Sequence, residues 1–490
     1  MRELLSQKEQ RQLNILEYLF ENQHWIHLED LSEILETNVR IIKSDIKEMR
    51  DFLPDFEIQS STAGILLLNP QNVGIEKIYQ YFLKKSVNFQ VLEAFFLLKA
   101  PFTYEHLSQH LDVSLPSLRK KVAEINKLLH GNYRFKLKVT PISLIGDEKD
   151  IRFFFSQYFH EAYGFFNWPF SNFNETDIEA FVSFFLRLTE YPASYTNLYQ
   201  LTTQTAVNLT RIQTGNLLDV TVQMVGHPSI YNQLSNFQDH LKHLSNILQI
   251  PLELSTIEQI FAAYIQPQFF FSVDDFLNAR EHSKLANHSY HSARDVLDNL
   301  SRKFGVTFSN TDELVWHLHN TALLERQEIN SESIISQNKS YTLHKMQKFF
   351  PEFYENAVFE MMRYKSSLGQ KDHTYSVTHL VYTLLTHSEG LIEQLLEKSK
   401  KVRVLVLSEF DFAHPRTLIS LYAFHTSNNI QYETWDKETL NVDEIMAANY
   451  DAILTNFDVK GLEHPKLINI SRMSNLQVIN ELNTISIKDL

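Results

Sequence analysis

Residues 103–146 read TYEHLSQHLDVSLPSLRKKVAEINKLLHGNYRFKLKVTPISLIG. The first part predicts a short helix with Thr103 as its N-cap, followed by the turn Asp-Val-Ser. A longer helix over about 115–129 comes next, and Pro116 fits its first turn, where a missing N–H has no cost. Alternating apolar and polar residues over 133–145 then predict a β-hairpin.

The same order of elements occurs earlier in the chain. A helix over 11–21 precedes a short helix over 27–36, the turn Thr37-Asn38, a helix over 39–53 and a hairpin signature that ends its turn at Gly64. Apolar residues recur at helical spacing in the two central helices, and we expect these to face the core: Leu28, Leu31, Ile34, Leu35, Ile41, Ile42, Ile46 and Met49. Two tandem copies predict paired winged helix-turn-helix domains, whose second helix enters the major groove of DNA.

The charge distribution permits this interpretation although the 490-residue chain has a net charge of −14. Residues 1–150 carry 19 Lys and Arg against 21 Asp and Glu, a net of −2, so the remainder carries −12. Within 115–146 there are seven basic residues and one acidic residue, Glu124. Because salt screens charges beyond about 8–10 Å, a local positive stripe can bind DNA on an acidic protein.

The candidate DNA contacts lie on the second helix of each unit and on the wings. They are Arg40, Lys43, Lys47, Arg50, Ser114, Ser117, Arg119, Lys120, Lys121, Lys127, Arg134 and Lys136. Asp45 and Glu48 lie among the cations of the first unit, which therefore has the weaker electrostatic case. Ser114 suits a phosphate contact and a helix start equally, and Asn126 either faces bases or points inward. Few residues suit bidentate base reading, so DNA shape is the expected source of selectivity.

Several classes of function are excluded by what the sequence lacks. It contains no cysteine, so a disulfide framework, a Cys nucleophile and a thiolate metal site are excluded. No glycine-rich phosphate loop, GxSxG or HExxH motif occurs, so we expect neither an enzyme nor a cofactor. His317 and His319 do not share a helix face, which argues against a metal site. The charged N-terminus and the lack of long apolar runs indicate a cytoplasmic chain without a membrane span.

Residues 150–395 predict two helical bundles of about 120 residues that repeat one pattern. The stretch 201–211 resembles 316–326, and each ends in arginine. Later in each half, 260–266 corresponds to 381–387. We expect the aromatic residues of 153–173 to form bundle core rather than a ligand pocket.

The last segment changes from helical to α/β character. Residues 401–407 are a continuous apolar run that suits a buried parallel strand. Helices over 415–427 and 442–448 alternate with strands over 430–435 and 451–456. This order predicts a small doubly wound domain in a chain that is otherwise mainly helical.

The predicted domains are 1–70, 71–148, 149–275, 276–396 and 397–490. Their order resembles the Mga/AtxA family of Gram-positive transcriptional regulators: two winged helix-turn-helix domains, two phosphotransferase-system (PTS) regulation domains, or PRDs, and an EIIB-like domain. The resemblance implies a cytoplasmic regulator of virulence or metabolic genes that binds promoter double-stranded DNA. It also implies histidine phosphorylation by a PTS phosphocarrier protein, and self-association as a homodimer or larger assembly through the C-terminal half.

The resemblance places phosphorylatable histidines in two settings, a helix of His-Leu-x-x-Ala-x-x-Arg type and the end of a later apolar helix. The candidates in the second PRD are His319 or His317 for the first setting and His387 or His379 for the second. The first PRD has Gln204 and Gln266 at these places, and glutamine cannot accept a phosphoryl group in this way. We therefore expect control through the second PRD and a mainly structural first PRD, where looser alternatives are His160, His227, His240 and His243.

The EIIB-like segment lacks the chemistry of an active EIIB. Such an enzyme has a phosphorylatable cysteine after its first strand, where residues 407–412 here read LSEFDF. A binding or dimerising role remains. A function of another class is also open: a protein-docking adaptor whose helix-turn-helix units bind protein. The basic segment 115–138 favours DNA, because an adaptor does not need it.

Overall fold

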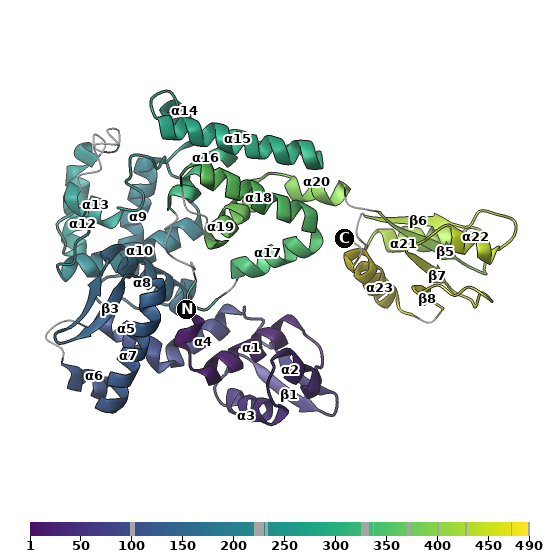
Figure 1. Cartoon of the computed structure of the whole chain (residues 1–490), viewed down its shortest axis with the longest axis horizontal. Coiled ribbons are helices and arrows are strands. Elements are labelled where there is room, and N and C mark those ends of the chain that lie inside the picture. The colour runs from purple at the N-terminus through teal and green to yellow at the C-terminus, as the bar shows by residue number, and fades with distance from the viewer. Residues whose placement is uncertain are drawn as a thin grey trace. The chain divides into compact units, whose positions relative to one another are not determined.

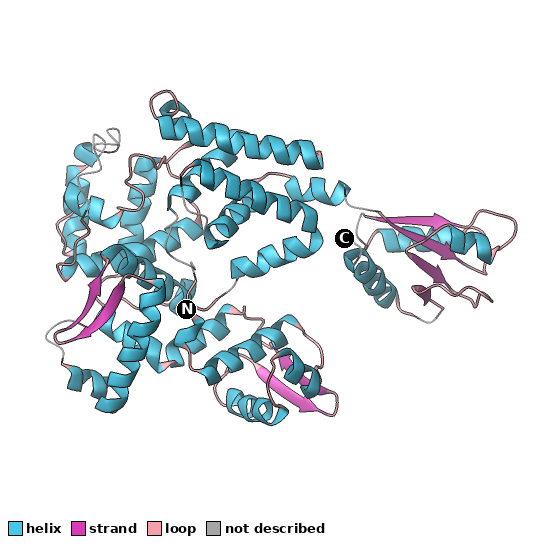
Figure 2. Ribbon diagram, viewed as in Figure 1, coloured by secondary structure: helices cyan, strands magenta, loops and turns pink. Residues whose placement is uncertain are grey.

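The computed structural model is mainly helical, and its described strands form two hairpins and one four-stranded parallel sheet (Figures 1 and 2). The described residues are 1–98, 103–219, 230, 234–324, 333–336, 338–369, 374–398, 401–426, 429–471 and 473–488. The chain forms two compact units. The first comprises 1–286, 322–338 and 373–376, and the second comprises 287–321, 339–372 and 377–490.

The first winged unit has the predicted order of elements. After a short 3-10 turn, three helices precede a hairpin: η1 (Arg2–Leu4), α1 (Gln7–Glu21), α2 (Leu28–Ile34), α3 (Val39–Arg50), β1 (Glu57–Ser61) and β2 (Gly64–Leu68). Ser6 and Glu9 form a capping box that begins α1. Ile26 pairs with Ile65 and thereby attaches the connection after α1 to the hairpin.

Two residues that were expected in the core of this unit are exposed. Ile41 is 41% exposed and Ile34 is 49% exposed. The buried stripe of α3 runs through Ile42, Ile46 and Met49, and Ile41 lies about 100° away from Ile42 around the helix, so it faces solvent. Ile34 is the last residue of a seven-residue helix whose single fully buried contact is made by Leu31.

The second winged unit repeats the first. Its elements are α4 (Glu76–Lys85), α5 (Val87–Leu97), α6 (Tyr104–His110), α7 (Leu115–Asn132), β3 (Phe135–Val139) and β4 (Ile142–Gly146). The turn between α2 and α3 and the turn between α6 and α7 contain the same side-chain hydrogen bond. Ser32 Oγ donates to the Thr37 carbonyl and Ser108 Oγ donates to the Val113 carbonyl, each at 2.5 Å. The residue before each acceptor, Glu36 or Asp112, has a φ of about 50°.

Helix α8 (Glu148–Tyr163) follows the second wing and forms the aromatic core of the first unit. Phe154, Phe155, Tyr158 and Phe159 are fully buried on it. Phe135 of the wing packs edge-on against Phe154 with ring centroids 5.5 Å apart. The expectation that the aromatic residues of 153–173 form core is confirmed for these four and for Phe170 and Phe173, whereas Phe165 is 44% exposed. A 3-10 turn and further helices follow: η2 (Gly164–Phe166), α9 (Glu175–Thr189), α10 (Tyr195–Gln213), α12 (Gln238–Leu248), α13 (Leu254–Ile260) and α14 (Val273–Ala279).

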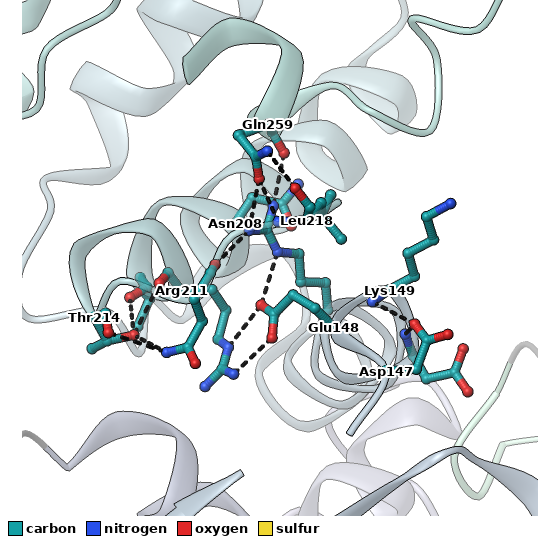
Figure 3. Close-up of polar contacts among 12 residues, drawn as sticks. Asp147, Glu148, Lys149, Asn208, Arg211, Thr214, Leu218 and Gln259 are labelled. Carbon is teal, nitrogen blue, oxygen red and sulfur yellow. Dashed lines mark hydrogen bonds and ion pairs between the residues drawn. The ribbon is translucent and has the colours of Figure 1, made fainter. Parts of the chain in front are cut away.

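A buried ion-pair network joins α8 to α10 (Figure 3). Arg211 donates from Nε and Nη2 to the two carboxylate oxygens of Glu148, at 2.9 and 2.7 Å. Arg152 donates to the same carboxylate at 3.0 Å and to the Gln259 carbonyl at 2.7 Å. Removing one partner from a buried ion pair generally costs about 3–5 kcal/mol. The arginine that ends the repeated motif 201–211 therefore has a structural role.

The later helices correspond only in part to the predicted repeat. They are α15 (Lys284–Phe304), α16 (Thr311–Leu324), α17 (Asn338–Phe349), α18 (Pro351–Ser367), α19 (Thr374–His387) and α20 (Leu391–Lys398). Gln204 lies on α10 and His319 on α16, as the alignment predicts. His387 ends α19, but Gln266 lies six residues beyond Ile260, where α13 ends, so the predicted correspondence between 260–266 and 381–387 does not hold in the helices. Arg326 lies outside the described residues.

The C-terminal residues form the predicted α/β domain with two additional elements. They comprise β5 (Val402–Leu407), α21 (His414–Ala423), β6 (Ile430–Thr434), α22 (Val442–Ala447), β7 (Ala452–Thr455), β8 (Leu467–Asn469) and α23 (Asn475–Lys488). The strand order is β6-β5-β7-β8. Helices α21 and α23 pack on one face and α22 on the other, so the domain is doubly wound. Strand β8 and helix α23 were not predicted from the sequence.

Candidate functional site

Helix α3 presents a cationic face without a competing acid. Arg40, Lys43 and Lys47 are exposed at helical spacing, and among the described residues none of them has an ion pair or hydrogen bond through its side chain. Asp45 is buried and accepts from Arg11 Nε of α1 at 2.6 Å. Glu48 pairs with Lys8 and lies 3.8 Å from Lys85 Nζ, and the neighbouring Lys8 lowers its pKa.

This arrangement changes the electrostatic case for the first unit. In the sequence alone, Asp45 and Glu48 weaken the case for DNA binding by this unit. Both carboxylates are neutralised by cations of other helices, so they subtract little from the field on the opposite face of α3. The first unit is therefore at least as well suited to a polyanion as the second.

Helix α7 presents a second cationic face. Ser117, Arg119, Lys120 and Lys127 are exposed on it, and Lys136 is exposed on the wing strand β3. No hydrogen bond or ion pair within the described chain engages the side chains of these four cations. Unlike α3, this face also contains an exposed acid, Glu124.

The other candidate contacts on these elements have internal partners. Ser114 caps α7 and accepts from the Ser117 N–H at 3.4 Å. Of the two roles that the sequence allowed for Ser114, the structure therefore shows the helix start. Lys121 is half-buried, and its Nζ donates to Asn88 Oδ1 at 3.3 Å. Arg134 is ion-paired to Asp147 at 2.9 Å and to Asp150 at 3.3 Å.

Helices α3 and α7 are each attached to the wing of their own unit by the twelfth residue of the helix. Arg50 Nε donates to the Ile58 carbonyl at 2.8 Å. Asn126 accepts from the Leu137 N–H at 2.7 Å and donates to the Leu137 carbonyl at 3.0 Å. The orientation of Asn126, open from the sequence, is inward to the wing. Arg50 and Asn126 therefore fix the angle between helix and wing.

In the second unit of the chain, two of the four histidine candidates meet at the surface. His317 on α16 and His387 at the end of α19 have ring centroids 3.9 Å apart. His387 is exposed, and its Nδ1 lies 3.2 Å from the Thr383 carbonyl. A carbonyl only accepts, so Nδ1 carries the proton and Nε2 keeps its lone pair. Glu313 Oε1 lies 3.9 Å from His317 Nε2.

Both histidines of this pair are held in the neutral form. Burial lowers the pKa of His317 to about 3, and the neighbouring His387 adds to the effect. Burial also lowers the pKa of His387, against a rise from its hydrogen bond to Thr383. A neutral imidazole is the form that attacks a phosphoryl group.

The remaining two candidates are enclosed to different degrees. His319 is 1% exposed, and its Nδ1 lies 2.7 Å from Ser289 Oγ, which in turn lies 2.6 Å from Tyr364 Oη. His379 is half-buried, with its Nε2 3.4 Å from Lys339 Nζ. The spacing of the four histidines in the sequence could not show which of them are enclosed, because burial depends on packing against residues far away in the chain.

The two glutamines of the first helical half have internal hydrogen bonds. Gln204 Oε1 accepts from Tyr264 Oη at 3.2 Å, and Gln266 Nε2 donates to the Ala263 carbonyl at 2.9 Å. Of the looser histidine alternatives, His160 packs against Tyr199, His240 packs against Phe184, His243 is exposed, and His227 lies outside the described residues.

In the loop after β5, a side chain of the loop accepts hydrogen bonds from the loop's own backbone N–H groups. Asp411 Oδ1 accepts the N–H groups of Ala413 and His414, at 2.7 and 2.9 Å, and Ser408 Oγ lies 2.7 Å from His414 Nδ1. A bound phosphoryl group would need such backbone donors, and here a carboxylate occupies them. The loop therefore does not fit the chemistry of a phosphate-relaying EIIB.

Three family models match successive parts of the chain: the M protein trans-acting positive regulator (MGA) HTH domain at 6–65, the Mga helix-turn-helix domain at 71–159 and the MGA PRD domain at 174–391. A Streptococcus pneumoniae protein named as a trans-acting regulator is 32% identical over 485 residues, 99% of this chain and 98% of that protein. The chain belongs to the Mga/AtxA family. The resemblance stated from the sequence is thereby confirmed.

More distant members of the Mga/AtxA family match part of the chain. The Bacillus anthracis capsule synthesis positive regulator AcpA is 26% identical over 176 residues, 36% of each chain. The anthrax toxin expression trans-acting positive regulator of the same organism is 23% identical over 212 residues, 43% of this chain and 44% of that protein.

Within the described residues, no helix is long and apolar enough to cross a bilayer. Within the same residues, no group of three or more His, Asp or Glu side chains is placed to hold a metal ion.

Replacing His317 by glutamine tests the neutral histidine pair through the pH dependence of stability. An unfolded histidine has a pKa near 6.5 and folded His317 one of about 3, so the unfolded state takes up more protons below pH 6.5. The stability contribution of the neutral form is complete above pH 6.5 and declines toward pH 3. Between pH 6.5 and 5.5, urea unfolding should show wild type losing up to about 1.4 kcal/mol more than His317→Gln.

The matched control is His344→Gln, which removes an exposed histidine of α17. It should keep the wild-type pH dependence. Equal pH dependence of wild type and His317→Gln would show that His317 does not stay neutral in the folded protein.

Proposed function

We propose that this chain is a transcriptional regulator that binds promoter double-stranded DNA through both winged units. The observation that carries the proposal is the pair of exposed cationic faces on α3 and α7. Six of their side chains have no hydrogen bond or ion pair within the described chain: Arg40, Lys43, Lys47, Arg119, Lys120 and Lys127. Cations without internal partners are free to pair with phosphates, and the release of counterions from DNA then supplies affinity. A cytoplasmic location, which access to the chromosome requires, is part of this proposal.

Replacing the cationic side chains of one helix should weaken DNA binding. It should also make that binding depend less on the salt concentration. Each phosphate contact contributes about 0.9 to the slope of log K against log salt. The variant Arg40→Ala/Lys43→Ala/Lys47→Ala should therefore lower that slope by about 2–3, and Arg119→Ala/Lys120→Ala/Lys127→Ala should do the same. Fluorescence anisotropy with a duplex at several salt concentrations measures the slope.

The control is Lys345→Ala/Lys348→Ala/Lys401→Ala, which removes the same charge from exposed positions outside the winged units. It should retain the wild-type slope. Equal slopes for all four proteins, or no salt-dependent binding by folded wild type, would favour the alternative that the helix-turn-helix units dock protein.

We also propose that a PTS phosphocarrier protein phosphorylates the second PRD at His387, with His317 as its partner. His387 is exposed and has its Nε2 lone pair available, whereas His319 is enclosed. A phosphoryl group adds about −1.5 to −2 charge. That charge would stand near Glu313 in the first turn of α16, so it would repel the start of α16 from the end of α19. The first PRD, with its bonded glutamines, would have a structural role.

The histidine assignment predicts which substitutions remove phosphorylation. Incubation with phosphoenolpyruvate-charged phosphocarrier protein should give acid-labile phosphate on wild type. His387→Ala should lose most of it, while His319→Gln and the exposed control His344→Ala should retain it. Retention in His387→Ala with loss in His319→Gln would contradict the assignment, because it would require the buried histidine to be the acceptor.

Self-association through the C-terminal domain is a further part of the proposal. Phe410, Phe412 and Phe424 on and beside α21 are 68%, 86% and 83% exposed. Exposed aromatic groups of this kind commonly mark interaction surfaces. The cysteine-free loop leaves this domain a binding role, which agrees with the self-association implied for the family.

A further inference from the structure

The segment Ser333–Ser336 is anchored in the first compact unit although it follows α16 in the chain. Ile334 and Ile335 are each 1% exposed and belong to the same hydrophobic core as α1 and α8. Loops generally run over the surface, so the burial of two consecutive residues between two helices needs specific partners. We call this segment the strap.

Glu161 at the end of α8 holds the backbone of the strap. Its carboxylate accepts the N–H groups of Ile334, Ile335 and Ser336, the last two at 3.0 and 3.1 Å. Hydrogen bonds to an ionised acceptor are roughly twice as strong as neutral ones. Three of them on one carboxylate make the strap a defined docked element.

Arg2 links the strap to the first winged unit. Its Nε donates to the Ile335 carbonyl at 2.7 Å, and its guanidinium forms an ion pair with Glu17 of α1. Glu17 also accepts from Tyr79 Oη of α4 at 2.7 Å. A displaced strap would leave Arg2 and Glu161 with unsatisfied groups in the core.

A second branch reaches the recognition helix of the second winged unit. Asn88 of α5 donates to the carbonyl of Leu4, which lies in the same N-terminal turn as Arg2, at 2.7 Å. Lys121 of α7 donates to the same Asn88 side chain at 3.3 Å. Hydrogen bonds therefore connect the strap, through the N-terminal turn, to α1 and to α7.

We propose that the strap is a regulatory element: when docked it holds both winged units in a DNA-binding arrangement, and movement of the histidine-bearing helix α16 releases it. This proposal rests on the proposed function, because it concerns how histidine phosphorylation alters DNA binding. Nine residues of sequence separate the end of α16 from Ile334, so the histidine-bearing helix and the strap are neighbours along the chain.

The test uses full-length protein with substitutions that weaken docking. Glu161→Gln retains the size of the side chain and removes its charge, and Ile334→Ser/Ile335→Ser alters the strap itself. Both should raise amide hydrogen exchange at 333–336 and lower duplex affinity about tenfold, a typical allosteric coupling. The salt slope should stay at its wild-type value, since no phosphate-contacting cation is removed.

The variant Glu124→Gln, which changes an exposed acid of α7, is the control and should leave strap exchange unchanged. Combining His387→Asp with Ile334→Ser/Ile335→Ser tests the link to the histidines. If the strap transmits the signal, His387→Asp lowers affinity in wild type and has no further effect in the strap variant. Additive effects would overturn that link.

Faster exchange at 333–336 with unchanged duplex affinity would show a purely structural strap and overturn the proposal while DNA binding stands. Absence of duplex binding by wild type would instead refute the proposed function. The loss of affinity must also occur without a shift of the unfolding midpoint of the winged units. If affinity falls only where those units unfold, the strap is a stability element and the proposal fails.

Discussion

Three carboxylates of α8, one buried and two half-buried, are the constraint on which the first compact unit depends. Glu148 pairs with Arg211 of α10, Asp150 accepts the Arg134 N–H at the start of the second wing, and Glu161 holds the strap. A buried carboxylate is costly unless it is paired and hydrogen-bonded, so each of these acids requires its partner element in place. One helix thereby joins the second wing, the first helical bundle and the segment that follows α16.

The placement of acids also explains how a chain with a net charge of −14 can present two cationic helices. On α3, Asp45 and Glu48 are bound by cations of neighbouring helices, and the exposed face keeps Arg40 and its lysines. Salt confines the field of the acidic remainder to short distances, so the local face determines the interaction. Net charge alone would have excluded a function that the local geometry supports.

The sequence was sufficient where local rules decide the structure. Both helix-turn-helix units follow from apolar periodicity, caps and turns, and strand β5 of the α/β domain follows from its mainly apolar run. Long-range packing decided the rest. Nothing local distinguishes exposed His387 from enclosed His319, or inward Asn126 from a base-reading one. The three-residue strand β8 is too short for a periodic signal, and the strap depends on partners far away in sequence, such as Arg2.

The central claim is that α3 and α7 both lie against DNA in one complex. Site-specific photocrosslinking tests it most directly, with p-benzoylphenylalanine in place of Ser44 on α3, Ser117 on α7 or, as a control, Tyr341 on α17, all of which are exposed. The account predicts that a labelled duplex crosslinks at positions 44 and 117 and not at 341. Crosslinking at neither helix, or equally at all three positions, would contradict it.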